Sequence, residues 1–96
     1  MSAVLEEIQS AGKVSRGETV LLRGKFKGLA QPTLVKVRFN GESVDADVYT
    51  DQQGYFVTEF PANVTKVGMY PITVELKEST EAGTVVTGET EVRITR

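Results

Sequence analysis

Apolar and polar side chains alternate at every second residue over several stretches of this chain, and the longest stretch lies at residues 68–76. There Tyr70, Ile72, Val74 and Leu76 take alternate positions. Successive side chains of a β-strand point to opposite faces, so a period of two indicates a strand with one buried face. The chain is therefore expected to fold into β-sheets that each bury one side.

Turn residues separate these stretches at short intervals. Asn40-Gly41 is typical of a tight hairpin turn, and the stretch from Asp51 to Gly54 is predicted to close a second hairpin. Gly17 is expected in a turn with a positive φ angle. The first predicted strand also fits a helical turn, but an edge strand is favoured. The pattern predicts about seven strands, at residues 4–9, 19–26, 34–39, 44–49, 55–60, 70–76 and 84–95.

The inward-facing residues of these strands predict one core, between the two sheets of an antiparallel β-sandwich. Gly24 is expected at a bulge or a close backbone approach, Gly88 at a bulge, and Pro71 at the start of its strand. The first and last strands are expected to be sheet edges. Residues 1–96 form one domain, with 1–12 as an edge strand or a linker remnant. The predicted core comprises Val20, Leu22, Phe26, Val35, Val37, Phe39, Val44, Ala46, Val48, Phe56, Phe60, Tyr70, Ile72, Val74, Leu76, Val86, Val92 and Ile94.

Composition excludes several kinds of chemistry. The chain has no cysteine, which excludes disulfides, thiol nucleophiles and cysteine-based zinc sites, and no histidine, which excludes a Ser-His-Asp triad. A formal net charge of -2 does not favour nucleic-acid binding. No run approaches the roughly 20 apolar residues that span a bilayer, so no membrane insertion is expected, and the start of the chain lacks a signal-peptide pattern. Either the protein is cytosolic or, as we favour, it is a module taken from a longer protein.

Four segments carry a family resemblance, in the order Gly17–Gly24, Val35–Gly41, Thr50–Phe56 and Gly68–Val74. Together they resemble the immunoglobulin-like modules of prokaryotic surface and secreted proteins, over roughly residues 13–95. Filamin-type repeats and macroglobulin-like domains share the Asp-x-x-Gly-x-Phe and Gly-x-Tyr-x-Ile-x-Val patterns, and the second hairpin is similar to the carboxypeptidase regulatory-like fold. The resemblance therefore implies an immunoglobulin-like β-sandwich.

The resemblance also implies a role, because modules of these families usually act as spacers, stalks or adhesion surfaces. Tyr70 resembles the tyrosine-corner residue, whose hydroxyl ties down a neighbouring loop. The chain departs from antibody-type and cell-receptor classes, since it has no core tryptophan and no cysteine pair. An extracellular or cell-surface location follows from the resemblance alone.

Asp45, Asp47 and Asp51 are the candidate metal ligands, with Glu42 close by, because clustered carboxylates suit Ca²⁺. A solvated acidic face with Asp51 as a turn residue is the favoured interpretation. The same carboxylates lie side by side without a cleft between them, which does not suit acid–base catalysis. We expect neither catalytic residues nor a cofactor.

Leu21, Tyr55 and Val57 are predicted on the solvent side of one sheet, where a small apolar patch can mark a docking surface. Scattered exposed apolar residues without function are the alternative. The exposed cations are expected to pair across strands rather than to bind anionic glycans, with Arg23 and Lys25 facing Glu59. These cations are Lys36 and Arg38 on one strand and Arg23, Lys25 and Lys27 on another.

The sequence thus favours a non-enzymatic structural or interaction module of a larger surface or secreted protein. Its expected partners are neighbouring domains of the same chain or another protein. The first alternative is a module that binds carbohydrate or protein through the loops at 28–32, 52–54 or 77–83. The second is a structural subunit of a phage or pilus-like assembly that works through edge strands. A glycosylation sequon at Asn63 lies where a loop is expected anyway.

Overall fold

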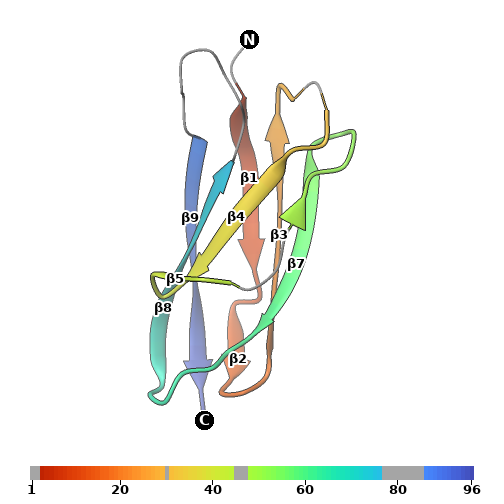
Figure 1. Ribbon diagram of the computed structural model, residues 1–96. Coiled ribbons are helices and arrows are strands. Elements are labelled where there is room, and N and C mark those ends of the chain that lie inside the picture. Colours follow the sequence, from red (N-terminus) through yellow and green to blue (C-terminus); the bar gives the residue numbers. More distant parts are fainter. Residues whose placement is uncertain (1–2, 30, 45–47, 77–85) are drawn as a thin grey trace.

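Two β-sheets packed face to face make up the computed structural model, which describes residues 3–29, 31–44, 48–76 and 86–96 (Figure 1). The described residues form strands and no helix. Over these described ranges, one sheet has three strands and the other has six. The predicted all-β, immunoglobulin-like sandwich is therefore confirmed.

The three-stranded sheet has the order β1 (Val4–Ser10), β3 (Thr19–Lys27) and β7 (Tyr55–Pro61), with both pairs antiparallel. β1 is a strand at the sheet edge, as favoured from the sequence, and not a helical turn. The register shifts between Leu5 and Glu7, and Glu6 and Glu7 are exposed. An irregular edge strand with charged side chains is poorly suited to pairing with another chain.

The six-stranded sheet adds a short parallel strand that the sequence does not predict. β2 pairs in parallel with the last residues of β9, so the C-terminal strand is not the bare edge expected there. Of the strand predicted at residues 44–49, the last two residues form β6. Residues 45–47 of that predicted strand, which include Ala46, lie outside the described residues. The order is β2 (Lys13–Ser15), β9 (Val86–Thr95), β8 (Gly68–Leu76), β4 (Leu34–Phe39) and β5 (Glu42–Ser43), and β6 (Val48–Tyr49) also pairs with β4.

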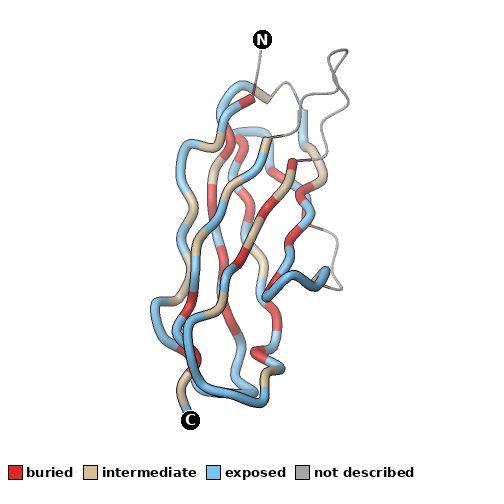
Figure 2. The backbone as a smooth tube through the Cα atoms, turned by 90° about the vertical axis from the view of Figure 1, so that its left-hand side faces the viewer, coloured by how far each residue is buried: buried red, intermediate tan, exposed pale blue. Residues whose placement is uncertain are grey.

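The core lies between the sheets, where two-residue alternation placed it. Figure 2 shows buried and exposed residues alternating along the strands. The rings of Phe39 and Phe60 join the two layers, with centroids 5.2 Å apart, and Tyr70 packs beside Phe39 within the six-stranded sheet at a centroid distance of 5.7 Å. Of the predicted core residues that are described, all are buried except Val44, Tyr70 and Val86, which are half-buried and pack against the core.

The turns at residues 40–41 and 51–54 show how particular residues direct the chain from one strand to the next. Asn40 and Gly41 both have positive φ angles, 54° and 83°, which is the pattern of a type I′ hairpin turn. The turn at 51–54 does not close a hairpin within one sheet as predicted, because β6 belongs to the six-stranded sheet and β7 to the three-stranded one. It is a corner between the layers, and the carbonyl oxygen of Gly54 accepts a hydrogen bond of 2.9 Å from the Phe26 amide.

Three predicted irregularities have different outcomes. Gly24 is a site of close approach, because a Cβ there would lie 2.7 Å from both the Glu7 carbonyl oxygen and the Phe56 ring. The β8–β9 register is continuous past Gly88, so the bulge predicted there is wrong. Pro71 lies inside β8 rather than at its start. The carbonyl of Pro71 accepts a hydrogen bond from the amide of Asn40, which lies just beyond Phe39–Ile72, the last β4–β8 pair. The missing N–H of Pro71 faces the same turn residue, so no hydrogen bond between two strand residues is lost.

The sandwich is elongated, with extents of 44 × 22 × 19 Å. The strand β1 begins near one end of the long axis, and the C-terminus lies at the other (Figure 1). β1, β2 and β9 all run toward the C-terminal end. The chain therefore enters the fold at one end and leaves it at the other.

Candidate docking face

The solvent side of the three-stranded sheet gathers the three apolar residues that the sequence singled out. Leu21, Tyr55 and Val57 are 47%, 46% and 64% exposed. In the β3–β7 register Leu21 lies opposite Glu59 and Arg23 lies opposite Val57, so Leu21 and Val57 are diagonal neighbours. Tyr55 precedes Val57 by two residues on the same face. We call these three residues the apolar patch.

Charged and polar side chains beside the apolar patch are paired with one another. The ammonium of Lys25 lies 3.1 Å from a Glu6 carboxylate oxygen and 4.9 Å from the centroid of the Tyr55 ring. The hydrogen bond that the Lys25 ammonium donates to Glu6 and the negative charge of Glu6 raise the pKa of Lys25 above its usual 10.5. Arg23 donates through Nε to Oε1 of Gln9 at 3.3 Å.

The sequence predicts that Lys25 faces Glu59, and this prediction is wrong. Lys25 pairs with Glu6 on β1, whereas Glu59 lies opposite Leu21 on the other neighbour of β3. Arg23 lies opposite Val57 and bonds to β1 as well. Arg23 therefore turns away from β7, whereas the Lys25 ammonium lies between Glu6 on β1 and the Tyr55 ring on β7, so it covers the Tyr55 end of the apolar patch.

A shallow hollow lies beside the apolar patch, with a volume of about 470 Å³. The hollow lies over Gly24, a residue of the central strand β3. Glycine has no side chain that could fill the hollow. Its walls are Glu7, Gln9, Arg23, Tyr55, Phe56 and Val57. The hollow is open to solvent, so it suits a side chain of a protein partner better than an enclosed small molecule.

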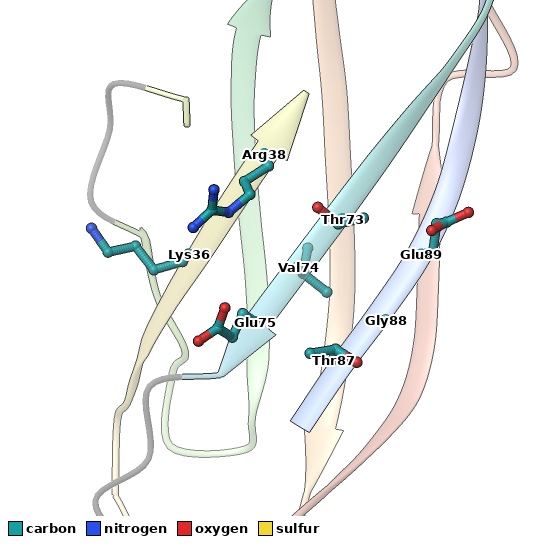
Figure 3. A pocket seen from close by; sticks show the side chains of 8 residues that line it. All are labelled: Lys36, Arg38, Thr73, Val74, Glu75, Thr87, Gly88 and Glu89. Atoms are coloured by element: carbon teal, nitrogen blue, oxygen red, sulfur yellow. The ribbon is translucent and has the colours of Figure 1, made fainter. Parts of the chain in front are cut away.

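The solvent side of the six-stranded sheet is different, because it carries cations on β4 and carboxylates on the neighbouring β8 and on β9 (Figure 3). Lys36 on β4 lies opposite Glu75 on β8. Thr73 on β8 lies between Arg38 on β4 and Glu89 on β9. This order of strands is the one expected from the sequence, and the salt-bridged outer face stays a prediction. A hollow of about 520 Å³ lies over this ladder.

The acidic candidates for calcium are only partly described. Oδ1 of Asp51 accepts hydrogen bonds of 2.9 Å from the backbone amides of Gln53 and Tyr55, so this oxygen organises the turn. Asp45 and Asp47 lie outside the described residues. The described part of the chain holds no group of three or more potential metal ligands. The calcium hypothesis stays a prediction.

The structure brings two of the three candidate loops together. The Thr33 amide donates to the Thr50 hydroxyl at 2.8 Å, and the Thr50 amide donates to the Thr33 carbonyl at 3.0 Å. These bonds hold the loop at 28–32 beside the turn at 52–54, although residue 30 is not described. The loop at 77–83 lies outside the described residues.

The fold is shared with solved structures of several kinds. The CARDB domain of a Pyrococcus furiosus protein, in complex with di-metal ions, matches with a TM-score of 0.56 and 21% identity over 99% of this chain and 94% of that chain. CopC from Methylosinus trichosporium matches at 0.58 and 16%, over 98% and 94%. The endo-β-1,4-mannanase from Thermotoga petrophila matches at 0.66 and 9%, over 100% of this chain and 20% of its own.

These structures share the β-sandwich fold. At such identities the likeness establishes the fold alone. No model of a protein family matches the chain, and no curated protein sequence matches it. Nowhere in the described residues is there a helix long and apolar enough to cross a membrane.

One charged surface is missed by sequence reasoning. The cations at the C-terminal end of the sandwich come from three separate segments, and none belongs to the two basic strands singled out above. The strand directions would have revealed this surface, because they decide which turns meet at which end. We call it the basic end, and it comprises Lys13, Arg16, Lys66, Arg93 and Arg96.

Proposed function

We propose that this chain is a non-enzymatic, load-bearing spacer module of a larger surface or secreted protein. The observation that carries the proposal is the path of the chain, which enters and leaves at opposite ends of a body 44 Å long. Modules joined in this way add their lengths, whereas modules whose termini lie together fold back on one another.

The first strands are also joined directly to the last one, which supports a load-bearing role. β2 pairs in parallel with the end of β9, and the Arg16 amide donates to the Thr95 carbonyl at 2.8 Å. Tension between the termini pulls β2 and β9 in opposite directions along their axes. Such a load strains the hydrogen bonds between them together rather than one after another.

Small-angle X-ray scattering of a chain with two copies in tandem tests the spacer proposal. The expected maximum dimension is about twice the 44 Å long axis plus the linker. A maximum dimension close to that of the single module would show that the copies fold back, and would contradict the proposal.

The apolar patch favours a second role, association with a second copy of this chain. The solvent side of the three-stranded sheet carries three cations and three carboxylates, so it is self-complementary in charge, as an isologous contact requires. The apolar patch lies among these charges, as interface centres do. They are Arg23, Lys25 and Lys27, and Glu6, Glu7 and Glu59.

Sedimentation velocity over a range of concentrations tests this second role. We expect the protein to form dimers, and the double variant Leu21→Ser/Val57→Ser to remain monomeric. Tyr49→Ser is the control, because Tyr49 is 61% exposed but belongs to the other sheet. Dimerisation of the double variant with unchanged affinity, or a wild-type protein that stays monomeric, contradicts the role of the apolar patch.

A further inference from the structure

The charge of this protein is distributed very unevenly along its long axis. The segments 12–18, 62–69 and 93–96 meet at the C-terminal end and contain five basic side chains and one acidic side chain, Glu18. This end therefore has a formal charge of +4, although the whole chain has a net charge of -2. Among the described residues, none of the five cations of the basic end forms an ion pair.

Strand pairing places the cations of the basic end close together. Lys13 and Arg93 are partners in the parallel β2–β9 pair, where like charges repel. Gly68 and Ile94 are the last pair of the β8–β9 ladder at this end. Lys66 lies two residues before Gly68, and Arg96 lies two residues after Ile94. All five cations of the basic end are exposed.

Two apolar side chains lie among these cations. Val67 is 51% exposed and follows Lys66 directly, and Met69 is 48% exposed and lies opposite Arg93. Cations flanking exposed aliphatic side chains are the arrangement by which proteins bind the surface of an anionic bilayer. The cations attract the lipid phosphates, and the aliphatic groups enter the boundary between headgroups and acyl chains.

The backbone beneath these side chains is fixed by hydrogen bonds. Arg16 donates through a guanidinium nitrogen to the Thr65 carbonyl at 2.8 Å, and its amide donates to the Thr95 carbonyl. The Tyr70 hydroxyl donates to the Lys66 carbonyl at 2.6 Å. The segment that carries Lys66 and Val67 is thus held in place before any partner arrives, which lowers the entropic cost of binding.

We propose that the basic end binds the surface of an anionic lipid bilayer, with Val67 and Met69 entering the interface. The sandwich would then stand with its long axis away from the membrane. This inference is independent of the spacer proposal, since it concerns one end of the module and not the path of the chain.

Co-sedimentation with lipid vesicles tests the proposal on the intact protein. We expect binding to vesicles that contain phosphatidylglycerol, release of the protein by added salt, and no binding to pure phosphatidylcholine vesicles. The triple variant Lys13→Gln/Lys66→Gln/Arg93→Gln should bind about a hundredfold more weakly, at roughly fivefold per cation. The control Lys27→Gln/Lys36→Gln/Arg38→Gln changes the net charge equally and should keep its affinity.

The double variant Val67→Ser/Met69→Ser distinguishes a membrane from a soluble polyanion. We expect it to bind anionic vesicles about tenfold more weakly and to bind immobilised heparin as the wild type does. Unchanged vesicle binding by this variant would overturn the proposal in favour of an acidic polymer. Equal binding of the wild type to neutral vesicles, or equal losses in both triple variants, would also overturn it. The salt release of the wild-type protein needs no variant and so does not depend on variant folding.

Discussion

The hydroxyl of Tyr70 donates a hydrogen bond of 2.6 Å to the backbone carbonyl of Lys66, four residues earlier in the chain. The ring of Tyr70 packs at 5.7 Å from that of Phe39. One side chain thus joins the core to the segment that enters β8. This is the tyrosine corner that the sequence predicts.

Tyr70→Phe should lower the free energy of unfolding by about 1 kcal/mol, because it removes the hydrogen bond and keeps the ring. Urea denaturation of both proteins measures the change. Tyr49→Phe is the matched control, since no hydrogen bond involves the Tyr49 hydroxyl among the described residues. A loss as large in the control would show that the corner is not the cause.

Gly54→Ala should be among the most destabilising single changes in the chain. Gly54 has a φ of 92°, and a Cβ there would overlap the backbone carbonyl of Phe26. We expect a loss of at least about 3 kcal/mol. Gly17→Ala has the same strain at φ 81° but open space around it, so its cost should be about 1 kcal/mol. Equal losses in urea denaturation would refute the steric explanation.

The Lys25–Glu6 pair should make stability depend on pH in the alkaline range. The pKa of Lys25 in the folded protein is raised above 10.5, mainly through the hydrogen bond that its ammonium donates to Glu6. A raised lysine pKa means that the contribution is complete below 10.5 and is lost as the pH rises through the folded value. Melting temperatures of wild type and Glu6→Gln should therefore converge above pH 10.5, and a constant difference would contradict this account.

Local sequence patterns were sufficient to predict the long strands but not to predict β2. The long strands each bury a series of alternate side chains, so their period is visible without knowledge of their partners. β2 has three residues and one buried side chain, Val14, between turn residues. It exists because β9 lies beside it, and a parallel contact across the whole chain leaves no local signal. The bulge predicted at Gly88 was wrong for a similar reason. Glycine is needed there because the Leu5 side chain of the other sheet occupies the space that a Cβ would fill.

The same distinction applies to the candidate surfaces. The apolar patch comes from two strands whose alternation shows which side chains face solvent, so Leu21, Tyr55 and Val57 could be predicted. Their neighbours could not, because the partner of Lys25 depends on which strand lies on which side of β3. The basic end required the complete topology, since its cations come from segments that meet only in the folded protein.

Mechanical unfolding between the two termini tests the load-bearing proposal most directly. Alternate amides of a strand face the same neighbour, and the Arg16 amide donates to β9, so the Val14 amide points to β9 and the Ser15 amide points away. Val14→Pro therefore removes a donor from the loaded strand pair, whereas Ser15→Pro places the same ring on the free side.

In optical-tweezers experiments with handles at both termini, Val14→Pro should unfold at a clearly lower force than the wild type. Ser15→Pro should unfold at nearly the wild-type force. This result would locate the mechanical resistance in the β2–β9 pair. Unfolding of the wild type and Val14→Pro at the same force would contradict the proposal that this module carries load between its termini.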